Sequence, residues 1–194
     1  TGKCKHAKIA GCGCVTDADC DDGNPCTTDI CDKAKKCQYV VTTSLSKAVS
    51  SGAGTTCALR ADDRVMCWGS NGFGQLGDGT KYMKNLPVLA KGLSAIKAVA
   101  TGGYHVCALR KTGQVLCWGR NNHGQLGSGN KLDKTTPVAV SGITTATAIT
   151  AGQFHSCAIL SAGSVVCWGQ NSHGQLGRSE EHTSELQSLA YLVC

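Results

Sequence analysis

The chain has 194 residues, with 14 cysteines, 25 glycines and only 3 prolines. This length suits one ordinary domain or two small ones. Such a high cysteine content is typical of disulfide-bonded proteins, although the chain is too long for a simple disulfide knot. No run of 18 apolar residues occurs, so the sequence predicts no membrane span. The chain begins at Thr1 and shows no signal peptide, which leaves the compartment open.

Charge changes sharply along the chain. Residues 1–45 contain six Lys and six Asp, a net charge of zero. Residues 46–177 contain eight Lys and four Arg against four Asp, a net charge of +8. Residues 178–194 contain one Arg and all three Glu of the chain, a net charge of −2. We therefore divide the sequence into these three segments.

The first segment, residues 1–45, is expected to be a disulfide module cut at its start. Lys3-Cys-Lys-His6 recurs as Lys36-Cys-Gln-Tyr39, and an odd number of cysteines is expected when a repeat is cut through. The stretch from Asp19 to Cys31 resembles the extracellular Cys-Thr-x-Asp-x-Cys repeats of slime-mould matrix proteins and secreted bacterial repeat proteins. Spacing alone does not give the pairing of its seven cysteines, which are Cys4, Cys12, Cys14, Cys20, Cys26, Cys31 and Cys37.

Two kinds of metal site compete with a plain disulfide scaffold in this module. Zinc is disfavoured because no Cys-x-x-Cys occurs. Calcium is a weak candidate, because oxygen-bearing residues alternate through a Gly-containing turn, but Thr28 replaces the Glu that closes a helix-loop-helix calcium site. We expect solvated turn residues and no cofactor, with calcium as the alternative at Asp17, Asp19, Asp21 and Asn24.

Residues 46–177 contain a repeat with a period of 50 residues. Cys-Ala-Leu or Cys-Ala-Ile begins at Cys57, Cys107 and Cys157, and Cys-Trp-Gly follows ten residues later in each copy. Short β-branched or alternating runs, bounded by Gly, Asn and Asp, predict strands. These lie near 46–50, 55–60, 64–69 and 86–90, and again 50 and 100 residues later. Four short strands in 50 residues are typical of a β-propeller blade.

The fixed positions of the repeat are predicted to be structural. The glycines of each Gly-Gln-Leu-Gly turn should take positive φ, with Leu76, Leu126 and Leu176 packed inward. The first copy departs from the pattern, because Thr55 stands where the others have histidine. The fixed residues are Trp68, Trp118, Trp168, His105, His155, Gly74, Gly77, Gly124, Gly127, Gly174 and Gly177.

Each copy also contains two cysteines ten residues apart, on either side of a three-residue hairpin loop. The third loop position favours a left-handed residue, which Gly113 and Gly163 supply and Asp63 tolerates. If the residues flanking the loop form a hydrogen-bonded pair, the cysteines occupy a non-hydrogen-bonded pair with Cα atoms about 4.5 Å apart, within disulfide range. We predict the bridges Cys57–Cys67, Cys107–Cys117 and Cys157–Cys167, and hence an oxidising compartment. The alternative is a pair of small buried residues on facing strands.

With its His-x-x-Ala-Leu, Trp-Gly and Asn-x-x-Gly-Gln-Leu-Gly motifs, the region 46–177 resembles the regulator of chromosome condensation repeat family. The resemblance implies an all-β, seven-bladed propeller. The three copies, 46–98, 99–148 and 149–177, amount to about 2.6 blades. We therefore expect a partial propeller, and further blades in the full-length protein.

The tail, residues 178–194, shares no pattern with the repeat. Residues 178–188 and 191–194 resemble an in-frame translation of a short-read sequencing adapter. We expect a non-native tail that does not belong to the fold. The alternative is a natural polar helix.

Catalysis is disfavoured by the sequence. The histidines to consider are His105, His155, His123 and His173, but each occupies a fixed position of the repeat, whereas an active site needs one asymmetric cluster. No nucleophile elbow, phosphate loop or pair of Glu is present. We expect no catalytic residue.

Two functions remain. The resemblance implies guanine-nucleotide exchange and chromatin binding, and the charge of +8 would suit an acidic partner. The predicted disulfides instead favour a secreted or cell-surface propeller whose variable loops bind a protein, and this is our prediction, with no nucleic acid as partner. The lysines of the loops are also consistent with a solvated face. Predicted contacts are Phe73, Lys81, Tyr82, Met83, Arg120, Lys131 and Lys134.

Overall fold

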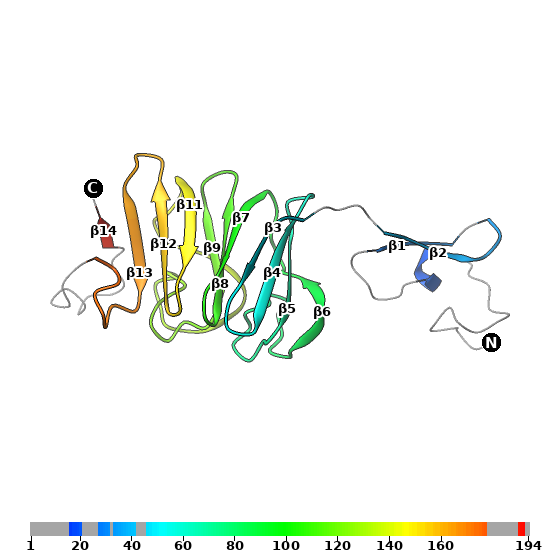
Figure 1. The fold of residues 1–194 in the computed structure, drawn as a ribbon, viewed down its shortest axis with the longest axis horizontal. Coiled ribbons are helices and arrows are strands. Elements are labelled where there is room, and N and C mark those ends of the chain that lie inside the picture. The colour runs from blue at the N-terminus through cyan, green and yellow to red at the C-terminus, as the bar shows by residue number, and fades with distance from the viewer. Residues whose placement is uncertain (1–15, 21–26, 32, 42–45, 178–189, 193–194) are drawn as a thin grey trace. The chain divides into compact units, whose positions relative to one another are not determined.

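The computed structural model describes residues 16–20, 27–31, 33–41, 46–177 and 190–192 (Figure 1). The chain divides into two compact units, Thr1–Ser44 and Leu45–Cys194. The first unit contains the 3-10 helix η1 (Asp17–Cys20) and an antiparallel hairpin of β1 (Thr27–Cys31) and β2 (Cys37–Val41). A disulfide joins Cys20 to Cys37 and so ties η1 to β2, and Cys31 is disulfide-bonded as well.

The second unit consists of three four-stranded antiparallel sheets, one for each copy of the repeat. In every sheet the strands follow one another in chain order, as in a propeller blade. The first blade contains β3 (Ser46–Ser51), β4 (Thr55–Arg60), β5 (Val65–Gly69) and β6 (Lys84–Leu89). The second contains β7 (Ile96–Thr101), β8 (His105–Arg110), β9 (Val115–Gly119) and β10 (Lys134–Ala139). The third contains β11 (Ala146–Ala151), β12 (His155–Leu160), β13 (Val165–Gly169) and β14 (Ala190–Leu192).

These sheets confirm the predicted all-β fold and its propeller blades. The first strands of neighbouring blades contact each other, β3 with β7 and β7 with β11. The register shifts at the same place in each blade, where β3, β7 and β11 carry one extra residue at Lys47, Lys97 and Thr147. Such a bulge increases the local twist, so the repeat in the sequence is reproduced in the fine geometry of the sheets.

The predicted hairpins connect β4 to β5, β8 to β9 and β12 to β13. In the first, the Arg60 amide donates to the Arg64 carbonyl at 2.9 Å and closes a three-residue loop. The third loop residue has positive φ in each blade: 62° at Asp63, 91° at Gly113 and 87° at Gly163. All three predicted cysteine pairs face each other with Cα atoms 4.1 Å apart and form disulfides.

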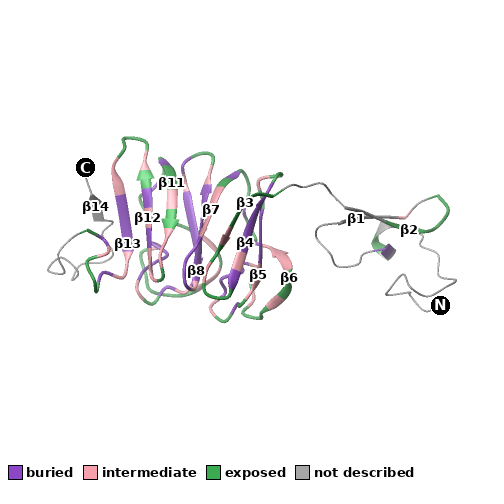
Figure 2. Cartoon of the chain, viewed as in Figure 1, coloured by how far each residue is buried: buried purple, intermediate pink, exposed green. Residues whose placement is uncertain are grey.

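The hydrophobic core lies between the blades. Because side chains alternate across a strand, the middle strands of the second blade pack one set of residues on the first blade and the other on the third. One cluster joins Leu59 and Leu76 of the first blade to Val106 and Trp118 of the second. An equivalent cluster joins the second blade to the third. Strand β8, which has a blade on either side, is therefore buried along most of its length (Figure 2).

The sheet faces without a neighbouring blade among the described residues are more open. Ile159 of the third blade is 43% exposed, whereas Leu109 at the same position of the second blade is fully buried. An apolar hollow on this face is lined by Ile149, Ile159 and Val165. On the opposite outer face, Trp68 of the first blade is half-buried, whereas Trp118 is completely buried.

The predicted origin of the tail stays a prediction, because residues 178–189 and 193–194 lie outside the described residues. The backbone of Ala190–Leu192 nevertheless pairs with β13 in the outer position that β6 and β10 hold in their blades. Its register differs from theirs. Leu89 faces Met66 and Ala139 faces Leu116, so the repeat would place residue 189 opposite Val166, where Tyr191 stands. The pairing is consistent with a free strand edge, which can bind a strand of any sequence.

Candidate protein-binding surface

The blades have two different ends. His105, the first residue of β8, pairs with Gly119, the last residue of β9. The short turn before β8 and the long loop after β9 therefore emerge at the same end, and the disulfide hairpins lie at the other. We call the first end the loop face. It comprises the turns 52–54, 102–104 and 152–154 and the long loops 70–83, 120–133 and 170–177.

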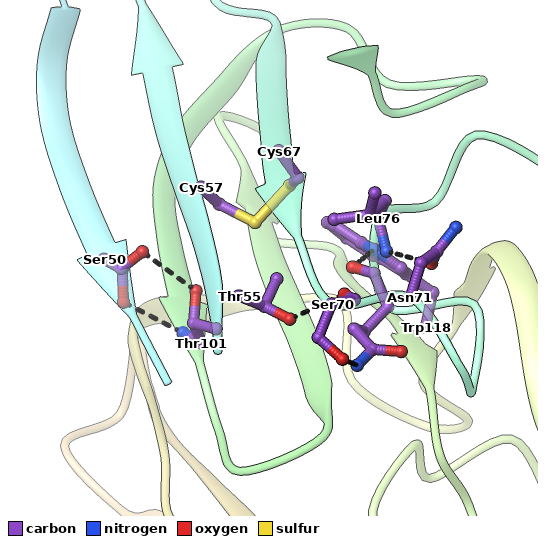
Figure 3. The surroundings of a disulfide bond; sticks show 10 residues. Ser50, Thr55, Cys57, Cys67, Ser70, Asn71, Leu76, Thr101 and Trp118 are labelled. Carbon is purple, nitrogen blue, oxygen red and sulfur yellow. Dashed lines mark hydrogen bonds between the residues drawn. A yellow bond between two sulfur atoms is a disulfide. The ribbon is translucent and has the colours of Figure 1, made fainter. Parts of the chain in front are cut away.

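The loop face is held by hydrogen bonds that cross from blade to blade. The Trp118 indole nitrogen donates to the Gln75 carbonyl at 2.8 Å, and Trp168 donates to the Gln125 carbonyl at the same distance. Figure 3 shows Trp118 beside the Leu76 turn of the preceding blade. At the inner strands, the Thr101 amide donates to Ser50 Oγ at 2.9 Å. Each of the first two Gly-Gln-Leu-Gly turns thus accepts a hydrogen bond from the tryptophan of the next blade.

The turns have the predicted conformation. All six turn glycines adopt positive φ, between 61° and 82°. Leu76, Leu126 and Leu176 are all buried. A Cβ atom at Gly77 would lie 2.8 Å from the Trp118 indole nitrogen, and one at Gly127 would lie 3.0 Å from that of Trp168. These two glycines are therefore required both by the turn and by the close approach of the next blade.

One asparagine fixes each long loop to its turn. Asn71 Oδ1 accepts the Leu76 amide at 2.9 Å, while its Nδ2 donates to the carbonyls of Thr80 and Tyr82. Asn121 makes the same bonds to Leu126 and to the carbonyls of Asn130 and Leu132. Both asparagines are buried, so the long loops have a defined backbone.

This fixed backbone presents apolar side chains to solvent. Tyr82 is 76% exposed, Met83 68% and Leu132 66%. Lys81 and Lys131 are exposed beside them, and Lys134 is partly exposed at the start of β10. Of the predicted contact residues, Tyr82, Met83, Lys81 and Lys131 therefore lie on the open surface of the loop face. Leu132 was missed, although it occupies the position of Tyr82 in the next copy.

The other predicted contacts, Phe73 and Arg120, belong to a cluster assembled from three blades. The Arg120 guanidinium lies 4.6 Å from the ring centre of Phe73 and 5.6 Å from those of Tyr104 and Phe154. Phe73 meets Tyr104 edge-on at 5.5 Å, and Tyr104 stacks on Phe154 at 5.9 Å. His123 packs 5.3 Å from Phe154. All five are partly exposed, and we call them the Arg120 cluster.

Sequence reasoning missed Tyr104 and Phe154. Both lie immediately before the repeated histidine, within a segment whose repetition predicts a structural role. One signal was available, because the first copy has Gly54 at that position and the other two have an aromatic ring. An aromatic side chain in an exposed turn packs on whatever lies beside it. Only the closeness of three blades shows that the neighbours are Phe73, Arg120 and His123.

The histidines have separate surroundings. His105 is buried and bonds to Ser156 Oγ at 2.8 Å. Burial, reinforced by the charge of His155, lowers the pKa of His105 to about 3, so its imidazole is neutral at pH 7. Burial also lowers the pKa of His155. His173 is exposed and contacts Ser172. His105 and His155 thus share a position at the start of a strand and a pKa lowered by burial, whereas His123 and His173 lie on long loops of the loop face.

The calcium prediction stays untested. Asp17 and Asp19 lie in η1, but Asp21 and Asn24 are outside the described residues. Within the described parts of the chain, no three His, Cys, Asp or Glu side chains are grouped as metal ligands would be. No helix in those parts has the length and apolar character of a membrane span.

Comparison with known protein families identifies the repeat. Two models of the regulator of chromosome condensation (RCC1) repeat match the chain, one at residues 62–109 and 112–159, the other at 47–75, 96–125 and 146–175. A comparison with curated proteins found no match.

Solved structures share the fold. Prp20p from Saccharomyces cerevisiae, described with its binding to Gsp1p and histones, is 22% identical, with a TM-score of 0.66 over 81% of this chain and 41% of its own. Yeast RCC1 (Prp20) bound to Kap60 is 24% identical, with a TM-score of 0.64 over 81% and 40%. Human WBSCR16 is 20% identical, with a TM-score of 0.66 over 80% and 40%. The chain thus spans about two fifths of these proteins, and it belongs to the regulator of chromosome condensation (RCC1) repeat family.

Proposed function

We propose that this chain is part of a secreted or cell-surface β-propeller whose loop face binds a protein partner and catalyses no reaction. The observation that carries the proposal is the exposure of Tyr82, Met83 and Leu132 on loops whose backbone is fixed by Asn71 and Asn121. A loop backbone that is already ordered loses little conformational entropy on binding, and Tyr is frequent among the residues that dominate interface energies.

The solved relatives support a binding role. Prp20p is described as binding Gsp1p and histones, and it is bound to Kap60 in a second structure. These proteins share the fold with the present chain, and a fold alone does not transfer a partner. The intracellular exchange and chromatin function remains the alternative.

The disulfides support the proposed compartment. The structure bridges Cys57–Cys67, Cys107–Cys117 and Cys157–Cys167 in the blades and Cys20–Cys37 in the first unit. Disulfides persist in oxidising compartments and are rare in the cytosol and nucleus. Alkylation of the native protein before and after reduction, followed by mass spectrometry, tests this part. Secretion predicts oxidised cysteines in all four pairs, whereas free thiols in the blade pairs would favour the intracellular alternative.

Binding is tested with two variants that remove apolar side chains. A partner is isolated from secreted proteins of the source organism with the full chain as bait, purified, and measured by titration. The triple variant Tyr82→Ser, Met83→Ser and Leu132→Ser should weaken binding by at least about tenfold. Val49→Ser is the matched control, because Val49 is 69% exposed but lies on β3. Equal affinity of the triple variant and the wild type would refute a loop-face interface.

A further inference from the structure

The Arg120 cluster brings a positive charge and three aromatic rings together on the loop face. Arg120 directly follows β9, and its amide donates to the Tyr104 carbonyl at 2.9 Å. Phe73, Tyr104 and Phe154 come from three successive blades, so the guanidinium lies where their turns meet. Contact with ring faces holds a guanidinium by cation–π attraction. Its N–H groups point outward in its own plane and can still donate hydrogen bonds.

Arg120 and Lys131 supply positive charge at the cluster, and the nearby Asp133 carboxylate accepts the Asn121 amide at 2.8 Å. His123 belongs to the cluster, and its pKa is lowered first by burial and then by the charges of Arg120 and Lys131. Lys131 is therefore close enough to add to the same field. Among the described residues, no carboxylate forms an ion pair with Arg120. The ion pairs of the blades involve Asp62 and Asp63, at the hairpin end of the first blade. An anionic group is the ligand that complements this arrangement.

We propose that the Arg120 cluster binds a carboxylate of the partner protein, in an acidic segment that also carries an aromatic side chain. Arg120 forms the fork-like pair of hydrogen bonds to the carboxylate, and Tyr104 and Phe154 pack against the neighbouring ring. The inference rests on the proposed function and specifies the chemistry of its partner. The apolar side chains Tyr82 and Met83 on the same face favour a protein over a phosphate-bearing ligand, because a phosphate would leave them without contact.

The test uses the full oxidised chain and a fluorescent random copolymer of glutamate and tyrosine, with binding followed by anisotropy. We expect tighter binding to this copolymer than to polyglutamate, and no binding to a copolymer of lysine and tyrosine. Arg120→Gln should weaken binding by at least about tenfold, the loss of a charge-assisted pair of hydrogen bonds. Arg120→Lys retains the charge without the planar fork and should recover only part of the affinity.

Lys97→Gln is the matched control. It removes the same charge from an exposed position at the start of β7, at the opposite end of the second blade, and it should change affinity by less than about twofold, as expected for a distant, screened charge. Equal losses for Arg120→Gln and Lys97→Gln would overturn the proposal in favour of general charge attraction. Binding to a neutral xylan that Arg120→Gln leaves unchanged would overturn it in favour of a carbohydrate site.

The purified partner separates this inference from the proposed function. If the triple variant at Tyr82, Met83 and Leu132 weakens partner binding while Arg120→Gln does not, the loop face binds its partner but not through a carboxylate at Arg120. If neither variant has an effect, both proposals are wrong. Near-ultraviolet circular dichroism of each variant establishes that the blades are folded.

Discussion

His105 and Ser156 meet across the boundary between the second and third blades, with His105 Nε2 and Ser156 Oγ 2.8 Å apart. Ser156 Oγ in turn donates to the Gln125 carbonyl at 3.1 Å, so His105 supplies the proton of the first bond. His105 Nδ1 is buried without a partner in the described structure. This boundary therefore depends on one neutral tautomer of a buried histidine.

At the boundary between the first and second blades, the two equivalent side chains form no hydrogen bond with each other. There the two positions are Thr55 and Val106. Thr55 Oγ1 donates within its own blade to the Ser70 carbonyl at 2.9 Å, and Val106 is fully buried. The chain thus contains two internally consistent pairs, Thr with Val and His with Ser.

These two pairs predict that His105 and Ser156 are strongly coupled in their contributions to the free energy of unfolding. Ser156→Val alone leaves His105 Nε2 buried without an acceptor, and should lower the free energy of unfolding by about 1–3 kcal/mol. The double variant His105→Thr with Ser156→Val recreates the Thr55–Val106 pair and should cost less than the two single changes together. Urea unfolding followed by tryptophan fluorescence gives the coupling from a double-mutant cycle. Additive costs would show that the two side chains act independently.

His105 also predicts a loss of stability in mild acid. Its pKa is about 3 in the folded protein and about 6.5 when unfolded. Between these values the unfolded state binds more protons, so His105 lowers stability as the pH falls below about 6.5, by up to about 1.4 kcal/mol per pH unit. His155 and His123, whose pKa values burial also lowers, add to this loss in the same direction. Urea unfolding between pH 7 and 4.5 measures the slope before Asp62 and Asp78, whose pKa values are lowered, begin to contribute.

The double variant at His105 and Ser156 should make this slope clearly shallower, because it removes the fully buried imidazole and leaves only the contributions of His155 and His123. His173→Gln is the control, since His173 is exposed on the loop after β13. If His173→Gln flattened the slope as much as the double variant, the acid sensitivity would not come from His105.

The sequence predicts the blades better than it predicts the surface. A period of 50 residues places every strand of the first two blades within about two residues, because alternation, hairpin loops and turn glycines are local signals. The cysteine spacing likewise leads to the facing pairs. The Arg120 cluster has no such local signal. Phe73, Tyr104 and Phe154 are separated by 31 and 50 residues in the sequence, and their meeting depends on the packing of blade on blade.

The fourth strand of the third blade shows a different limit. The tail carries none of the motifs of the repeat, yet Ala190–Leu192 pairs with β13, close to the strand that a strict period of 50 places near 186–190. Hydrogen bonding to a free edge needs a backbone and no particular side chains. Periodicity therefore indicates a strand at this edge but does not give its register, in which Tyr191 faces Val166.

The three blade disulfides should differ in their resistance to reduction. Cys57 and Cys107 are buried between blades, at 0% and 1% exposure, whereas Cys157 is partly exposed on the open face of the third blade. Thiolate attack requires access to a sulfur atom, so dithiothreitol should open Cys157–Cys167 first. Brief reduction, trapping with iodoacetamide and peptide mapping by mass spectrometry give the order. Simultaneous opening of all three would mean that reduction requires global unfolding.

A turn glycine can be required by a left-handed backbone or by a close contact with a neighbouring residue, and Gly77 has both constraints. Gly77 has φ of 73°, and a Cβ atom there would lie 2.8 Å from the Trp118 indole nitrogen. Gly92 has φ of 69° but no atom within 4 Å of the added carbon, and Gly72 has neither constraint. Gly72→Ala should leave stability unchanged, and Gly92→Ala should cost about 1 kcal/mol for the left-handed backbone alone.

Gly77→Ala should cost clearly more, about 3 kcal/mol, because the methyl group displaces Trp118 from its hydrogen bond to the Gln75 carbonyl as well as straining the backbone. Urea unfolding of the three variants ranks these costs directly. If Gly77→Ala and Gly92→Ala were equally destabilising, Trp118 would move away from the added methyl group at no cost in free energy. The Trp118 bond to the Gln75 carbonyl would then contribute nothing measurable to the boundary between the first and second blades.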